Sequence, residues 1–132
     1  MSRKKRQSKL NFPFTGMPKH ITRSDAWFSC RPAARLIWFA VLERFDGANN
    51  GAISLSVREA AKYAGCSPNT AGRMFNELID AGLLICSQTS SFNSGKRLAR
   101  LWELTHLPKE GKVATNLWKS VSAKASSKRD TI

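Results

Sequence analysis

Three side chains on one predicted helix carry hydrogen-bonding groups of the kind that pair with nucleic-acid bases. Asn69, Arg73 and Asn76 follow one another at spacings of four and three residues, which places them on one helical face. An asparagine amide can pair with two atoms of adenine, and an arginine guanidinium with two atoms of guanine. We therefore take these three as candidates for contacts to base edges. The nearby hydroxyls of Ser67 and Thr70 are candidates for phosphate contacts.

Each of these residue types also has a purely structural interpretation. Arg73 could form an ion pair with Glu77, one helical turn later. Asn69 could cap the start of the helix, a position where asparagine is common. The sequence leaves both interpretations open.

Other basic side chains flank this helix. Arg58 and Lys62 lie on the polar side of the preceding predicted helix and either contact phosphates or form a solvated face. Lys96 and Arg97, with Asn93, lie at the predicted tip of a hairpin, from which they could reach a phosphate backbone or a minor groove. Arg100 shares a strand face with Trp102, and we expect it to shield the sheet.

The charge of the chain is concentrated at its two ends. The 132 residues include 22 Lys and Arg against 9 Asp and Glu, for a net charge of +13. Residues 109–132 hold six basic and two acidic residues, whereas residues 1–9 hold no acid and five basic residues, Arg3, Lys4, Lys5, Arg6 and Lys9. Basic arms neutralise phosphates, so a polyanion partner is expected, with this N-terminal arm in a minor groove or along the backbone. Solubility alone would explain one such tail.

The elements that position these residues follow from hydrophobic spacing and helix-capping signals. A long apolar helix is predicted over residues 31–45, with Pro32 in its first turn. Ser56 and Glu59 form a capping box, which predicts a second helix that ends at Gly65. Apolar residues then recur at helical spacing in a third helix, which begins near residue 68 and is ended by Gly82.

The link between the second and third helices has the residue types of a helix–turn–helix. Such a unit needs a small residue where the helices cross, a glycine in the left-handed turn, a small buried residue, a polar cap and an inward-facing residue. These five positions are filled in register by Ala61, Gly65, Cys66, Ser67 and Ala71.

Two strands follow the third helix. Residues 83–89 and 97–105 are predicted as antiparallel strands around a polar tip at residues 90–96, and residues 53–55 form a short strand earlier in the chain. The predicted fold is α+β and mainly helical: a winged helix–turn–helix with a three-helix core, a β-hairpin wing and basic flexible tails. We expect residues 1–9 to be a disordered basic arm, 10–108 the domain, and 109–132 a mostly flexible tail.

The stretch Gly-Cys-Ser-Pro-Asn-Thr-Ala-Gly-Arg, residues 65–73, resembles the turn and recognition helix of bacterial winged helix–turn–helix DNA-binding proteins. Residues 24–27, 31–35, 49–61 and 102–105 are similar to small helix–turn–helix proteins of bacterial and prophage genomes, and some parts are similar to winged-helix replication initiators. The resemblance covers about residues 10–108 and implies binding of double-stranded DNA. Gly72 departs from it, because a bulkier residue is usual there.

Several classes of function find no support in the sequence. No Ser-His-acid, Cys-His, paired-carboxylate or phosphate-loop arrangement is present, so an enzyme is not expected. The three cysteines and two histidines are scattered, which predicts neither a metal site nor any cofactor. No apolar run approaches the length of a membrane span. We expect a cytoplasmic protein associated with the bacterial nucleoid, with double-stranded DNA as its partner and without a small-molecule ligand.

Three functions remain in competition. The first is a sequence-specific regulator of transcription. The second is an accessory or initiator protein in plasmid or phage replication or recombination, which the two basic tails also fit. The third is a protein–protein interaction module, suggested by the apolar cluster Leu117, Trp118 and Val121. A homodimer is left open, since nothing in the sequence selects an interface.

Overall fold

The computed structural model describes residues 11–89, 91–93, 96–98 and 100–121, with the backbone alone for 91–93 and 96–98. It confirms an α+β chain in which helices dominate. The elements are α2 (Lys19–Thr22), α3 (Asp25–Ser29), α4 (Pro32–Glu43), β1 (Ile53–Ser54), α5 (Val57–Ala64), α6 (Pro68–Asp80), β2 (Leu84–Gln88), β3 (Ser91–Asn93), β4 (Lys96–Leu98), β5 (Leu101–Leu104) and the 3-10 helix η1 (Leu117–Ser120).

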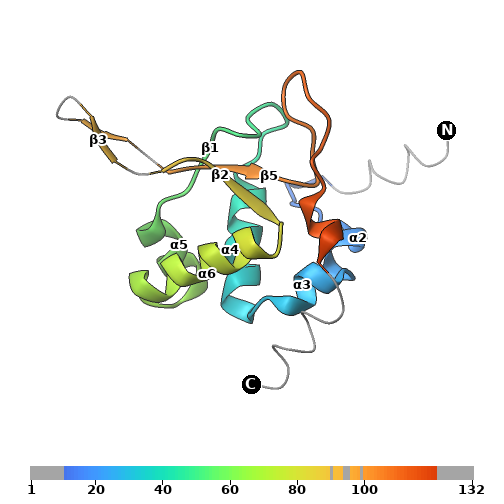
Figure 1. Ribbon diagram of the computed structural model, residues 1–132, viewed down its shortest axis with the longest axis horizontal. Helices are drawn as coiled ribbons and strands as arrows, with labels where there is room; N and C mark the ends of the chain where they lie inside the picture. Colours follow the sequence, from blue (N-terminus) through green and yellow to red (C-terminus); the bar gives the residue numbers. More distant parts are fainter. Residues whose placement is uncertain (1–10, 90, 94–95, 99, 122–132) are drawn as a thin grey trace.

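A small antiparallel sheet lies along one side of the helices (Figure 1). Its strand order is β1-β5-β2, with Ile53 opposite Trp102 and Leu84 opposite Leu104. The pair β3–β4 continues from β2 and β5 but projects away from the helices, as Figure 1 shows at upper left.

The long helix α4 packs against both α5 and α6 and forms the centre of the core. Its side chains Ile37, Trp38 and Val41 are completely buried. The sequence predicts a helix that is apolar nearly all round, yet Leu36 is 46% exposed and Phe39 is half-buried. One apolar stripe of α4 therefore faces away from the core.

Local capping fixes α5 and α6 as the sequence predicts. The Ser56 hydroxyl accepts a hydrogen bond from the Glu59 backbone N–H, and the Glu59 carboxylate accepts one from the Ser56 N–H. Gly65 ends α5 in the left-handed region, with φ +70°, a conformation that costs a side-chain-bearing residue about 1–2 kcal/mol. Ser67 then caps α6. Only Cys66 differs from expectation, because it is half-buried rather than buried.

The hairpin differs from the predicted pair of continuous strands. The ladder between β2 and β5 shifts register between Cys86 and Gln88, and the outer part of the hairpin pairs as a separate ladder, β3 with β4. The return strand predicted over residues 97–105 is therefore wrong as one element, and part of the predicted tip at 90–96 is strand. A register shift bends a strand pair and increases its twist, which redirects the outer hairpin.

The segment before α3 contains the short helix α2, whose Ile21 is completely buried. Beyond residue 108, η1 brings Trp118 into the core, where it is 8% exposed. The backbone passes so close to Gly82 that a Cβ there would lie 2.6 Å from the Leu117 carbonyl oxygen. Gly82, with φ +74°, is thus the point on which the C-terminal segment docks.

Candidate functional site

The two faces of α6 differ sharply. Its inward face is buried in the core at Ala71, Met74, Phe75 and Leu78. Asn69, Arg73 and Asn76 are all exposed on the opposite face. The structure therefore places the three candidate base contacts together on an open helical surface.

A chain of hydrogen bonds orders the first half of this face. The Ser67 hydroxyl accepts from the Thr70 backbone N–H at 3.1 Å and donates to Thr70 Oγ1 at 3.0 Å. The Arg73 guanidinium also donates to Thr70 Oγ1, at 3.4 Å. Because Thr70 accepts both bonds, its own hydroxyl proton is left for an outside acceptor, whereas the Ser67 proton is already engaged. Of the two hydroxyls, Thr70 is the better placed for a phosphate.

The structure has neither the ion pair between Arg73 and Glu77 nor the helix cap at Asn69 that the sequence left open. Glu77 is 7% exposed, and its carboxylate accepts a 2.6 Å hydrogen bond from the Arg31 backbone N–H and lies 3.7 Å from Arg31 Nε. The predicted partner of Arg73 is thus engaged across the core. The cap of α6 is Ser67, and Asn69 lies two residues into the helix.

Packing and hydrogen bonds within the described part of the chain do not explain why three residues stand on the outward side of α6. Within the described residues, the amides of Asn69 and Asn76 make no hydrogen bond. Gly72 lies inside the helix, where glycine costs about 1 kcal/mol relative to alanine. A Cβ at Gly72 would meet no atom of the residues described by the structure within 4 Å. Packing against these residues therefore does not require glycine there.

The remaining candidates are distributed around this face. Arg58 and Lys62 are exposed on α5. Lys96 and Arg97 lie in β4, whose backbone alone is described. The five basic residues of the arm, within residues 1–9, fall outside the described part of the chain.

The charges near α6 are predominantly positive. Between Ala60 and Trp102 the chain has five basic residues, and Glu77 and Asp80 are its two acids. Glu77 is buried against Arg31, so Asp80, at the far end of α6, is the exposed acid of this segment. Of the acids just outside it, Glu59 on α5 is paired with Arg44 at 3.0 Å, and the Ser56 N–H and this arginine hold the pKa of Glu59 below its ordinary value.

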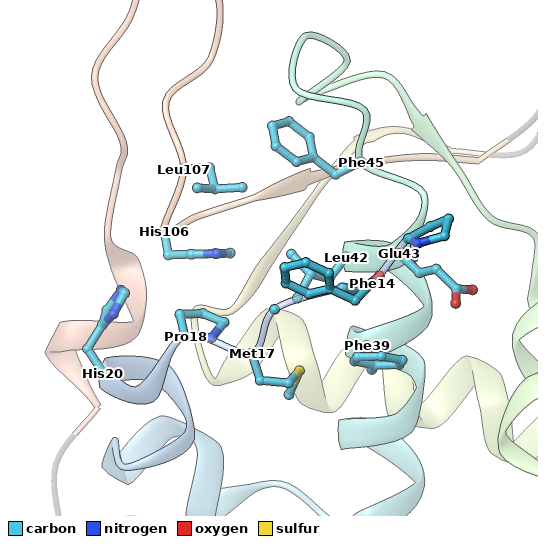
Figure 2. A pocket seen from close by; sticks show the side chains of 13 residues that line it. Phe14, Met17, Pro18, His20, Phe39, Leu42, Glu43, Phe45, His106 and Leu107 are labelled. Carbon is cyan, nitrogen blue, oxygen red and sulfur yellow. The ribbon is translucent and has the colours of Figure 1, made fainter. Parts of the chain in front are cut away.

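A separate cleft of about 930 Å³ lies on another part of the molecule and was not anticipated from the sequence (Figure 2). The 13–18 segment, α4 and the turn after β5 face one another across it, with aromatic side chains from Phe14, Phe39 and Phe45. His106 lies at its edge, and its buried Nδ1 has no hydrogen-bond partner in the described ranges of the chain. Burial, and secondarily the charge of His20, lower the pKa of His106 to about 4. No sequence signal could reveal this cleft, because its walls come from three distant segments.

Among the residues that the structure describes, no group of three His, Cys, Asp or Glu side chains is placed to hold a metal ion. In the same part of the chain, no helix combines the length and apolar character that crossing a bilayer requires.

Comparisons with protein-family models, curated proteins and solved structures gave no match to this chain.

Proposed function

We propose that this protein binds double-stranded DNA sequence-specifically, with α6 as the recognition helix of a winged helix–turn–helix and β3–β4 as its wing. In this arrangement the N-terminal part of α6 lies in the major groove. Asn69, Arg73 and Asn76 contact base edges, while Thr70 and basic side chains of α5 contact phosphates.

The observation that carries the proposal is the outward face of α6. It presents two amides without a partner among the described residues, an ordered guanidinium and a glycine that packing does not explain. Such a face has the donors and acceptors that base edges require, and at Gly72 it lets another surface approach the helix backbone closely.

The surroundings of α6 favour a polyanionic partner. The exposed acids close to it are few, and the hairpin projects beyond the sheet on the side where α5 and α6 lie (Figure 1). A projecting hairpin beside a groove-binding helix can contact the adjacent backbone or minor groove. The proposal is for a binding protein without catalytic chemistry.

The protein–protein alternative loses part of its support. It was suggested by the cluster Leu117, Trp118 and Val121, of which Leu117 is 46% exposed, whereas Trp118 is buried in the core of its own chain and its indole N–H donates to Asn116 Oδ1 at 3.2 Å.

The decisive experiment is selection of bound duplexes from a random DNA pool, with the full chain at about 0.15 M salt. We expect an enriched motif. With Arg73→Ala, the preference at one base position should flatten, at a loss of about 1–3 kcal/mol for the preferred base. Enrichment of no motif, or a motif unchanged by Arg73→Ala, would contradict the assignment of α6.

For the biological role we propose regulation of transcription. Footprinting of the protein on the DNA upstream of its own gene tests this role. Protection of a defined site is expected, whereas motif-dependent maintenance of a plasmid without such protection would favour the replication alternative.

A further inference from the structure

Arg100 occupies the seam between the sheet and α6. Its backbone carbonyl accepts a 3.4 Å hydrogen bond from the Leu55 N–H, just before the cap of α5. Its guanidinium carbon lies 5.9 Å from the ring centre of Phe75 on α6 and 5.8 Å from that of Trp102 on β5. Arg100 thus lies where the candidate recognition helix, the start of α5 and the base of the hairpin meet.

The two rings do not satisfy this charge. Phe75 and Trp102 are stacked, with centres 4.2 Å apart and planes 10° from parallel. A group nearly equidistant from two stacked ring centres lies beside the stack rather than over an outer face. Ring edges carry the positive end of the aromatic quadrupole, so they attract a cation much less than a ring face does.

Among the residues that the structure describes, no acid neutralises Arg100 either. Its Nε is buried without a hydrogen-bond partner, and the side chain forms no ion pair or hydrogen bond with any described residue. Other half-buried or buried charges among the described residues have polar partners: Glu77 is paired with Arg31 and Glu103 with Lys109, and the half-buried Arg35 donates its Nε–H to the Trp27 carbonyl at 3.1 Å. A half-buried cation without an anion is unfavourable, so an oxyanion bound to the guanidinium would stabilise it.

We infer that the Arg100 guanidinium is a phosphate-binding site at the junction of recognition helix and wing, and that its occupant is a phosphate of the DNA backbone. The guanidinium fork matches two phosphate oxygens, and a planar cation held against a rigid aromatic stack loses little freedom on binding. This inference rests on the proposed function and adds to it a contact that no candidate from the sequence supplied.

The test compares Arg100→Met and Arg100→Lys with a charge-matched control, Arg23→Met. Arg23 is exposed next to α2, on the side of the molecule away from α5 and the hairpin (Figure 1). Binding to a duplex with the selected motif and to an unrelated duplex is measured over a range of salt concentrations. Urea unfolding of each variant, and stabilisation by inorganic phosphate, are measured in parallel.

Arg100→Met should weaken binding to both duplexes about tenfold and reduce the slope of log affinity against log salt by about one. The urea midpoint should stay the same or rise, because the variant removes an uncompensated charge but keeps the aliphatic packing. Arg100→Lys should recover part of the affinity, and Arg23→Met should change little. Stabilisation of the wild type by inorganic phosphate that Arg100→Met abolishes would support the same site independently.

The outcomes separate the two proposals. If the wild type binds its motif and Arg100→Met matches it in affinity and salt slope, the Arg100 inference is wrong and the proposed function stands. If Arg100→Met lowers the urea midpoint as strongly as it lowers affinity, Arg100 is a structural residue and the inference again fails. If the wild type binds no duplex, both proposals fall.

Discussion

Replacing Gly72 with alanine should raise the stability of the protein and lower its affinity for DNA. Gly72 is internal to α6, and a Cβ there meets no atom of the described residues within 4 Å. Alanine removes the conformational cost of glycine in a helix, so the free energy of unfolding should increase by about 1 kcal/mol. Urea unfolding measures this change directly.

The expected effect on DNA binding has the opposite sign. If the backbone at Gly72 lies against the groove, an added methyl group forces the two surfaces apart, and overpacking of this kind costs about 1–3 kcal/mol. The Kd for the selected duplex should then rise by about 5- to 150-fold. Fluorescence anisotropy at fixed salt provides the measurement.

A control variant separates a stiffer helix from a blocked contact. Asp80→Ala improves the far end of α6, where an acid opposes the helix dipole, without altering the outward face. It should stabilise the fold and leave affinity equal or slightly higher. A Gly72→Ala protein that is more stable and binds DNA as tightly as the wild type would refute the close approach at this residue. A less stable Gly72→Ala protein would refute the description of its surroundings.

Three further predictions concern other parts of the chain. Gly82→Ala should destabilise the fold by more than about 2 kcal/mol, because the added Cβ clashes with the Leu117 backbone and the residue also bears the strain of a positive φ. Gly65→Ala has the same kind of backbone strain but no described atom near its Cβ, so it should cost only about 1–2 kcal/mol. The urea midpoints of the two variants measure the difference. His106 has a pKa near 4 in the folded protein, below its ordinary value, so the unfolded chain binds the extra proton first as the pH falls below about 6.5. The wild type should therefore lose about 2 kcal/mol more stability than His106→Gln between pH 7 and pH 4, allowing for screening at a half-buried site, and equal losses would contradict the shift. Removal of residues 1–9 should lower affinity for all duplexes alike and flatten the salt dependence; a changed sequence preference would show that the arm, rather than α6, selects the site.

The sequence predicted well wherever a structural signal is local. The capping box of Ser56 and Glu59, the left-handed turn at Gly65 and the cap at Ser67 each involve residues within a few positions of one another. Helical periodicity likewise identified the inward face of α6, because burial of one stripe leaves a repeat in the sequence. Together these signals were sufficient to place the exposed face that carries Arg73.

Contacts between distant segments were predicted poorly. Glu77 lies one helical turn after Arg73, and the spacing of four residues predicts an ion pair between them. In the folded chain, the Glu77 carboxylate instead binds Arg31, which is 46 residues away in the sequence. The sequence predicted a mostly flexible tail for the segment that contains Trp118, although this segment docks against Gly82, more than 30 residues earlier. Neither contact produces a local pattern in the sequence.

What the amino-acid sequence determined by itself is the order of the main helices α4, α5 and α6 and the polar face of α6, because caps, turns and periodic burial act over a few residues. What only the tertiary structure decided is which charges are satisfied. Within the described part of the chain, it pairs Glu77 with Arg31, leaves the buried Nδ1 of His106 without a hydrogen-bond partner, and places Arg100 beside an aromatic stack with no anion near it. Electrostatic satisfaction depends on distance and burial in three dimensions, and those are set by the packing of segments far apart in the chain.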